Sequence, residues 1–190
     1  MSKLFSRICA GITISVVVLN ATSPVYAAPK SSFGNGKFTV SKQIQSGIYR
    51  ATSVGARCYW EISTTGSNGN DIIANGNNVG GILTLNLSAG QDIENRGCGN
   101  FARSSLTAKR GTPRKTFGNG IWLVGIDVQP GSYVAVKSAL GTHCYLAIST
   151  AGSNGSDILA NQNYTNGTPS MTLDVGEEIE NDGCGMFKQG

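Results

Sequence analysis

The chain is poor in histidine, in charge and in helical patterning. Its 190 residues include one histidine, His143, and charged residues make up only 14%. No long segment carries apolar residues at the spacing of an amphipathic helix. The scarcity of histidine weighs against catalysis that moves protons near neutral pH, and the missing periodicity weighs against a helical fold.

Turn-forming residues are abundant instead. The chain contains 26 glycines, and Asn, Ser and Thr are common. This composition favours short strands joined by tight turns. The sequence therefore predicts an all-β protein, built as two tandem small antiparallel β-sandwich or barrel-like domains.

The first 27 residues have the layout of a secretory signal peptide. Lys3 and Arg7 precede an apolar run from Ile8 to Leu19, and small residues follow up to Ala27. A membrane anchor is the alternative, but the run has about 12 residues where a spanning helix needs roughly 20. We expect cleavage after Ala27 or Ala28, and thus a protein secreted to the outside or loosely associated with the cell wall.

An internal repeat organises the remainder. Residues 33–101 align with residues 117–187, and the second copy is expected to extend to residue 190. Residues 28–32 form a short N-terminal segment, and residues 102–116 separate the copies. The matched motifs are Phe33-Gly34-Asn35-Gly36 with Phe117-Gly118-Asn119-Gly120, Cys58-Tyr59 with Cys144-Tyr145, Gly66-Ser67-Asn68-Gly69 with Gly152-Ser153-Asn154-Gly155, and Gly97-Cys98-Gly99 with Gly183-Cys184-Gly185. Such similarity indicates a duplicated module.

Four cysteines remain once Cys9 leaves with the signal peptide. An even number in an exported chain indicates disulfides, and each copy holds one early and one late cysteine. The simplest pairing is Cys58–Cys98 and Cys144–Cys184, so each domain is closed by one bridge. A shared metal site is the alternative, but these cysteines lack the close paired spacing of zinc sites.

The segment between the copies is basic. It contains Arg103, Lys109, Arg110, Arg114 and Lys115 and no acidic residue. This composition predicts a flexible, solvated linker. Without the signal peptide and these five residues the net charge is −3, so the basic character does not belong to the domains. A nucleic-acid partner is therefore not expected, and neither is a membrane span in the mature chain.

Six strands are expected in each copy. In the first copy they are Lys37–Ser41, Ile48–Thr52, Arg57–Ser63, Asp71–Ala74, Ile82–Leu87 and Gln91–Glu94. In the second copy they are Ile121–Gly125, Tyr133–Lys137, His143–Ser149, Asp157–Ala160, Ser170–Asp174 and Glu177–Glu180. Alternation places Cys58, Trp60 and Ile62 toward the core, with Tyr59 and Glu61 on the other face.

Catalytic and metal sites are weakly supported. His143 aligns with Arg57, so the copies share no histidine base, and no catalytic residue is assigned. The shared carboxylates Asp92/Glu178 and Glu94/Glu180 could form a hydrolase pair but are more simply solvated side chains. Asn68 and Asp71 resemble calcium-loop residues, yet one aspartate per loop is few for Ca²⁺ and suits a turn. No metal and no cofactor is expected.

Two tyrosines are the candidate binding residues. Tyr59 and Tyr145 follow the early cysteine in both copies and alternate away from the core row. Aromatic rings give a binding surface a large contact area at low entropic cost. We therefore assign ligand binding to Tyr59, Tyr145 and the neighbouring Glu61; the alternative is that the rings cover the disulfide or the edge of the core.

The repeated motif resembles a known kind of module. Gly47-Ile48-Tyr49, Cys58-Tyr59-Trp60, Asp71-Ile72-Ile73-Ala74-Asn75 and Gly97-Cys98-Gly99 are similar to small extracellular repeat modules of actinobacterial and related Gram-positive secreted proteins. The second copy departs from this pattern at Leu146, which replaces the tryptophan. The resemblance implies an extracellular module and carries over no catalytic residue.

The sequence thus favours a secreted, non-enzymatic binding or cell-surface interaction protein. Its partner would be an extracellular glycan, a wall polymer or a protein, and two modules on one chain could raise avidity. A secreted inhibitor or effector that binds another protein is the alternative, and a hydrolase is a distant third.

Overall fold

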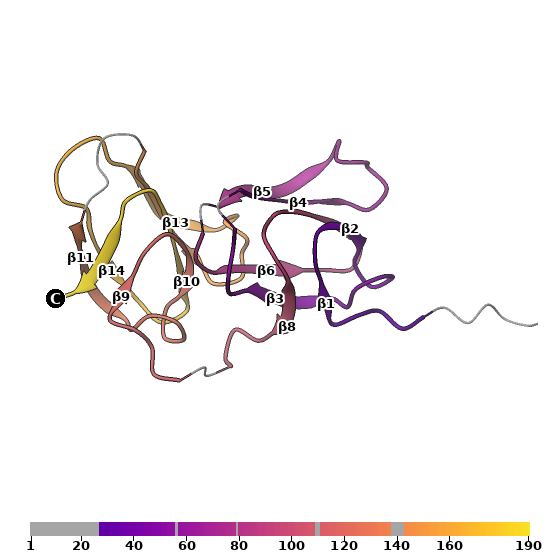
Figure 1. Ribbon diagram of the computed structural model, residues 1–190, viewed down its shortest axis with the longest axis horizontal. Helices are drawn as coiled ribbons and strands as arrows, with labels where there is room; N and C mark the ends of the chain where they lie inside the picture. The colour runs from indigo at the N-terminus through magenta and orange to yellow at the C-terminus, as the bar shows by residue number, and fades with distance from the viewer. Residues whose placement is uncertain (1–26, 56, 79, 109–110, 138–142) are drawn as a thin grey trace, which may run out of the picture.

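The protein consists of two β-sandwich halves that lie side by side (Figure 1). The computed structural model describes residues 27–55, 57–78, 80–108, 111–137 and 143–190. The expected signal peptide lies almost wholly outside this part. The all-β class is confirmed, with four antiparallel four-stranded sheets divided equally between the halves.

The first half contains eight strands in two sheets. The strands are β1 (Ser32–Phe33), β2 (Gly36–Thr39), β3 (Gly47–Ala51), β4 (Cys58–Thr64), β5 (Ile72–Asn78), β6 (Leu83–Leu87), β7 (Gln91–Arg96) and β8 (Phe101–Ser104). One sheet has the order β1-β8-β3-β6 and the other β2-β7-β4-β5. The strands β5 and β6 therefore lie at the edges of their sheets.

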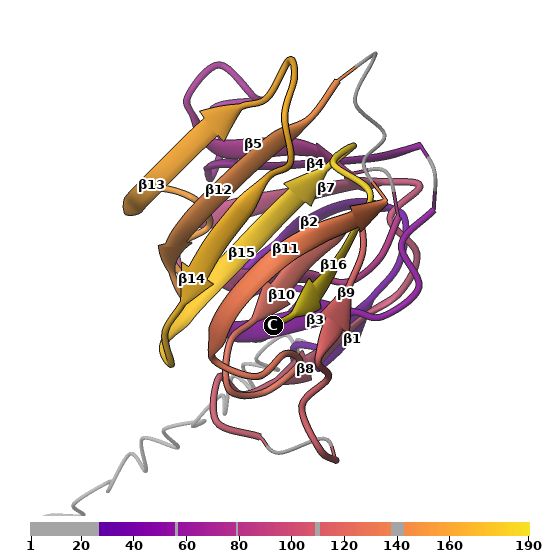
Figure 2. The ribbon, with the colours of Figure 1, turned by 90° about the vertical axis from the view of Figure 1, so that its left-hand side faces the viewer.

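The second half repeats this topology strand for strand. Its strands are β9 (Thr116–Phe117), β10 (Gly120–Leu123), β11 (Gly131–Lys137), β12 (Tyr145–Thr150), β13 (Ile158–Asn163), β14 (Ser170–Leu173), β15 (Glu177–Asp182) and β16 (Met186–Gln189). The sheet orders are β9-β16-β11-β14 and β10-β15-β12-β13, and Figure 2 shows this half toward the viewer.

Each of the twelve expected strands has a counterpart in the structure, but β1, β8, β9 and β16 were not predicted. The pairs β1–β8 and β9–β16 join the beginning and the end of each copy through two residues on each strand. The strands β1 and β9 have only two residues each, too few for an alternation that a sequence pattern can detect. These strands extend each half beyond the aligned repeat. The segment before β1 is also bonded to the first half, because the backbone N–H of Lys30 donates to Gln43 O at 2.9 Å.

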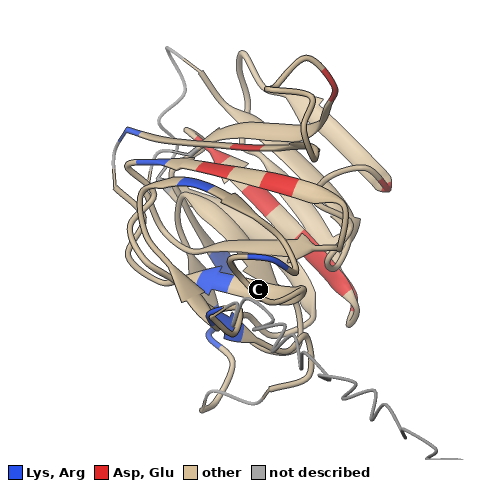
Figure 3. Ribbon diagram, turned by 90° about the vertical axis from the view of Figure 1, so that its right-hand side faces the viewer, with Lys and Arg blue, Asp and Glu red and all other residues tan. Residues whose placement is uncertain are grey.

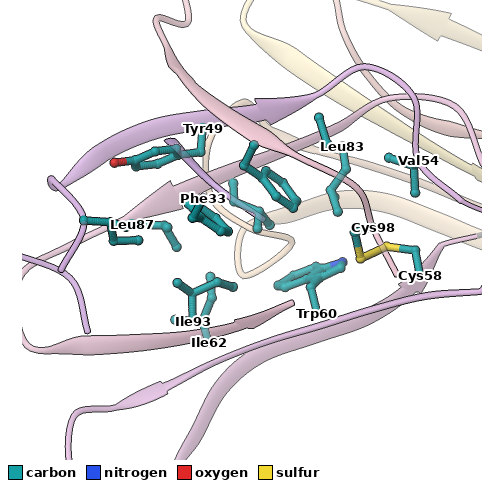
Figure 4. Packing of buried hydrophobic residues seen from close by; sticks show 14 of the residues in the cluster. Phe33, Tyr49, Val54, Cys58, Trp60, Ile62, Leu83, Leu87, Ile93 and Cys98 are labelled. Carbon is teal, nitrogen blue, oxygen red and sulfur yellow. A yellow bond between two sulfur atoms is a disulfide. The ribbon is translucent and has the colours of Figure 1, made fainter. Parts of the chain in front are cut away.

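Both predicted disulfides are confirmed. Cys58 bonds to Cys98 and Cys144 to Cys184, each with a sequence separation of 40 residues. In the first half the bridge ties β4 to the turn that follows β7, and in the second half it ties the residue just before β12 to the turn that follows β15. In the first half the predicted core row is buried, because Cys58, Trp60 and Ile62 are at most 4% exposed. Figure 4 shows Trp60 between the sheets beside the disulfide.

The Gly-x-Tyr motif places a tyrosine in each core. Tyr49 and Tyr133 are completely buried, and each hydroxyl donates to a backbone carbonyl four residues earlier, Gln45 O and Gln129 O, at 2.8 Å. A buried phenol needs such a partner because an unpaired polar group is costly in the interior. The motif is therefore structural.

The two halves pack against each other through different faces. The Arg50 guanidinium on β3 pairs with the Asp127 carboxylate of the second half at 2.6 Å, and both side chains are buried. The backbone N–H of Ile121 on β10 donates to Ile82 O, next to β6, at 2.8 Å. Asn154 exchanges two hydrogen bonds with the backbone of Asn86 on β6. The β10 sheet of the second half thus covers the β3–β6 side of the first.

Two glycines permit a close backbone approach between the halves. Gly120 has a φ of +121°, and a Cβ there would lie 2.8 Å from Ile82 N. A Cβ on Gly81 would lie 2.0 Å from Asn119 O. Larger residues at either position would force the two backbones apart.

The linker is attached at both ends. The Arg103 side chain donates to Gln45 Oε1 at 2.9 Å, and the backbone N–H of Arg114 donates to Asp127 O at 2.8 Å. These bonds order parts of a segment whose composition suggested full flexibility. Lys109 and Arg110 lie outside the described residues.

Candidate functional site

A polar surface lies on the outer side of the β2-β7-β4-β5 sheet in the first half. We call it the open face and define it by Lys37, Tyr59, Glu61, Glu94 and Arg96. Strand register brings these residues together, because Glu94 pairs with Lys37 on one side and Glu61 on the other, while Arg96 pairs with Tyr59. Figure 3 shows acidic and basic positions close together on the sheets of this half.

Four side chains of the open face, those of Tyr59, Glu61, Glu94 and Arg96, form one connected network. The Tyr59 hydroxyl donates to Glu61 Oε2 at 2.6 Å, and Arg96 Nε donates to Glu94 Oε1 at 2.5 Å. The Arg96 guanidinium also lies over the Tyr59 ring, 5.5 Å from its centroid. Like charges directly opposite on neighbouring strands repel. The phenol and the guanidinium offset this repulsion between Glu61 and Glu94.

Ionisation of Tyr59 is suppressed in this network. The hydrogen bond that the phenol donates to Glu61 raises its pKa, and partial burial and the Glu61 charge add to the effect, while Arg96 opposes it. The phenol therefore remains a hydrogen-bond donor at physiological pH. The open face offers a ring, two carboxylates and two cations whose formal charges cancel.

The corresponding surface of the second half is covered by the first half. We call it the junction face; its residues are Ile121, Leu123, Tyr145, Ala147 and Glu180. By the repeat, Ile121 replaces Lys37, Leu123 replaces Thr39 and Ala147 replaces Glu61. Ile121, Leu123 and Ala147 are all buried, and Ile121 joins the hydrophobic core cluster of the first half.

Tyr145 lines a cavity at this junction. The cavity has a volume of about 150 Å³, and residues of both halves enclose it, including Trp60, Thr84, Tyr145 and Glu180. The two tyrosines therefore have different surroundings: Tyr59 lies on the open face and Tyr145 beside the first half. Asn161 Nδ2 lies 3.5 Å from the Tyr145 hydroxyl.

Two carboxyl groups at the junction are shifted toward their neutral forms. Burial raises the pKa of Glu178, against hydrogen bonds from Gly152 and Ser149. Burial also raises the pKa of Glu180, and the charges of Asp182 and Glu178 add to this. The junction therefore stabilises the ionised forms of these two carboxyl groups less than water does.

The structure brings together two of the three predicted binding residues. Tyr59 and Glu61 are in direct contact, whereas Tyr145 belongs to the junction; a binding role for any of them remains a prediction. Sequence reasoning missed Lys37, Glu94 and Arg96 as members of the surface. The signal was available in part, since Glu94 and Arg96 alternate along one strand as Tyr59 and Glu61 do.

The asparagine-rich loops build turns. Asn68 and Asn154 adopt left-handed backbone conformations with φ of 54° and 56°, and Thr64 Oγ1 donates to the Asp71 carboxylate at 2.6 Å. These geometries account for the Asn and Asp residues at these positions. Within the described residues, no group of three or more His, Cys, Asp and Glu side chains is placed to hold a metal ion.

Comparison with known proteins agrees with the extracellular character of the module. No curated protein and no solved structure matches the chain. None of the residues that the structure describes forms a helix with the length and hydrophobicity that a membrane span requires. Residues 30–102 match the model of the Rv1352-like extracellular domain, an actinobacterial family. With its two disulfides, the protein is therefore extracellular, and its first half is similar to the Rv1352-like extracellular domain.

Proposed function

We propose that the protein binds an extracellular glycan or wall polymer through the open face of its first half. One observation carries the proposal: the same face of the duplicated sheet is apolar and covered in one half but polar and uncovered in the other. Burial against the first half explains Ile121, Leu123 and Ala147. No comparable packing within the described residues explains the Tyr59–Glu61–Glu94–Arg96 network.

The chemistry of the open face suits a neutral, hydroxyl-rich ligand. An aromatic ring offers an apolar platform, and carboxylates accept hydrogen bonds from hydroxyl groups. Lys37 and Arg96 balance Glu61 and Glu94, so a strongly anionic or cationic polymer gains little net attraction. The network also holds the side chains in place before binding, which reduces the entropy lost when a ligand binds.

Retention on purified insoluble cell-wall polysaccharide tests the proposal. We expect Tyr59→Ala to weaken retention about tenfold or more, because aromatic anchors dominate such interfaces. Glu61→Gln should weaken it less. Tyr145→Ala is the matched control, since it removes the repeat-equivalent ring at the junction, and its retention should stay near that of the parent protein.

The alternatives give different results in the same assay. Equal losses from Tyr59→Ala and Tyr145→Ala, with native thermal unfolding, would support two binding sites instead of one. Release of reducing ends from the polysaccharide would indicate a hydrolase. If no polysaccharide retains the protein, a glycan ligand is wrong, and a protein partner becomes the function to test.

A further inference from the structure

A cleft opens at one edge of the second half, away from the open face. It has a volume of about 260 Å³ and lies between the edge strands β13 and β14. Leu146, Ile148, Ala160, Tyr164 and Met171 supply its apolar walls, and amide and hydroxyl groups of Gln162 and Thr172 lie among them. Figure 2 shows β13 and β14 on the side facing the viewer.

The first half shows what fills the same position. By the repeat, Leu146 corresponds to Trp60 and Gln162 to Gly76. Trp60 pairs with Gly76 across β4 and β5, and a Cβ on Gly76 would lie 2.8 Å from Trp60 Nε1. The indole therefore lies directly against the bare backbone of β5. A planar ring closes this edge of the first sandwich.

The second half lacks that ring, and its edge strand is uncovered as a result. In the first half, Ala74 and Gly76 are only half-exposed, and Ala74 packs against the core. In the second half every residue of β13 is exposed, including Ala160 and Gln162 on the side that faces the core. Leu146 is too short to cover this side of β13.

We propose that this cleft binds a planar aromatic ring bearing an N–H or O–H group at its edge. The ring would occupy the position that the Trp60 indole has in the first half. The aliphatic walls match its faces, and the thioether of Met171 makes favourable contacts with aromatic rings. The Gln162 amide and the hydroxyl groups at the rim accept hydrogen bonds from the ring edge.

Two sources could supply such a ring: a free aromatic compound, or the side chain of a peptide segment. A peptide would add main-chain hydrogen bonds to an edge strand, as Ile121 does when its N–H bonds to Ile82 O beside β6. Free indole and a capped Gly-Trp-Gly peptide are therefore separate arms of the test. Cyclohexanol serves as a non-planar control of comparable polarity.

Titration of the ¹⁵N-labelled full chain with each probe measures binding. We expect indole to shift, in a saturable way, the amide signals of the cleft residues Leu146, Ala160, Gln162 and Met171. The Kd should be on the order of 1 mM. A peptide source predicts tighter binding of the capped peptide, and a free compound predicts equal or weaker binding. Cyclohexanol should not saturate the site. Indole shifts that do not saturate, or that lie elsewhere, overturn the proposal.

A variant in which a side chain of the protein itself fills the cleft is the decisive test. Leu146→Trp combined with Gln162→Gly reproduces the first-half arrangement and should weaken indole binding at least tenfold. Gln162→Gly alone removes one hydrogen-bond acceptor but leaves the cleft open, so it should weaken indole binding by no more than about threefold. If the double variant does not fold, Ala160→Trp tests the same point from β13 itself. Undiminished indole binding in a folded, filled variant overturns the proposal.

Discussion

The two halves share one topology and differ in the surfaces they present. Lys37, Thr39 and Glu61 face outward on the first half, whereas Ile121, Leu123 and Ala147 occupy the same positions in the second and are buried. Core positions such as Tyr49 and Tyr133 stay the same. Divergence after the duplication has therefore changed the residues on the sheet surfaces more than those in the cores. In the second half, these changed surface positions lie where the halves touch.

The cores also differ at one position. Trp60 closes the β5–β6 edge, while Leu146 leaves the β13–β14 edge open. The change is coupled to a second one, because the indole fits only where residue 76 has no side chain. Both differences can be tested by substitutions that give a residue of one half the identity of its equivalent in the other.

The largest effect is expected from the ion pair that joins the halves. Arg50→Met leaves the Asp127 carboxylate buried without its cation and should lower the free energy of unfolding by about 3–5 kcal/mol. Asp127→Asn added to Arg50→Met removes the stranded charge and should restore more than half of the loss. Chemical denaturation checks both, and a loss below about 1 kcal/mol for Arg50→Met would show that the halves do not depend on this pair.

An exchange of repeat-equivalent residues tests the junction directly. Ile121→Lys places the first-half residue in a buried position and should destabilise the protein by about 3 kcal/mol. The reverse change, Lys37→Ile, affects an exposed position and should alter stability by no more than about 0.5 kcal/mol. Similar effects of the two substitutions in thermal unfolding would mean that the faces are not distinguished by burial.

The tryptophan site gives a smaller effect. Gly76→Ala introduces a methyl group into the space of the Trp60 indole and should cost about 2 kcal/mol of stability. Gln162→Ala, at the equivalent exposed position, should change stability by less than about 0.5 kcal/mol. Denaturation midpoints measure both variants. If Gly76→Ala changes stability as little as Gln162→Ala does, the indole can move aside.

The smallest effect concerns the acidic group at the junction. Burial raises the pKa of Glu180 above its ordinary value of 4.5, so the folded state binds the proton more readily than the unfolded state. This part of the stability grows as the pH falls from 7 toward 4.5. Glu180→Gln should therefore stabilise the protein by about 1 kcal/mol at pH 7 and give no gain near pH 4. A gain that is independent of pH would contradict this origin.

The framework could be predicted because it depends on local patterns. Alternation around Trp60 gave the core row, and the position of one early and one late cysteine in each copy gave both disulfides. The pairing of Glu94 with Glu61 and Lys37 depends on the register between strands distant in sequence, which no local pattern specifies. The site could therefore be predicted only in part.

The packing of the halves was the main feature that sequence analysis missed. A signal existed, since Ile121, Leu123 and Ala147 are apolar on the side of their strands where the first copy has Lys37, Thr39 and Glu61. Taken alone, each of these residues resembles an ordinary exposed apolar side chain. Only the comparison between equivalent positions shows that a whole face has lost its polarity.

The use of unlike faces at the junction makes the association of modules directional. In a symmetric pair, both partners bind through the same patch, and the assembly is then closed. Here each half binds through a different surface, so one surface at each end stays unoccupied and could bind a further module. Lys37 and Glu61 oppose such growth, because burying them against another sheet would strand their charges. At the first-half end of the protein, the charged open face therefore disfavours the packing of a further module.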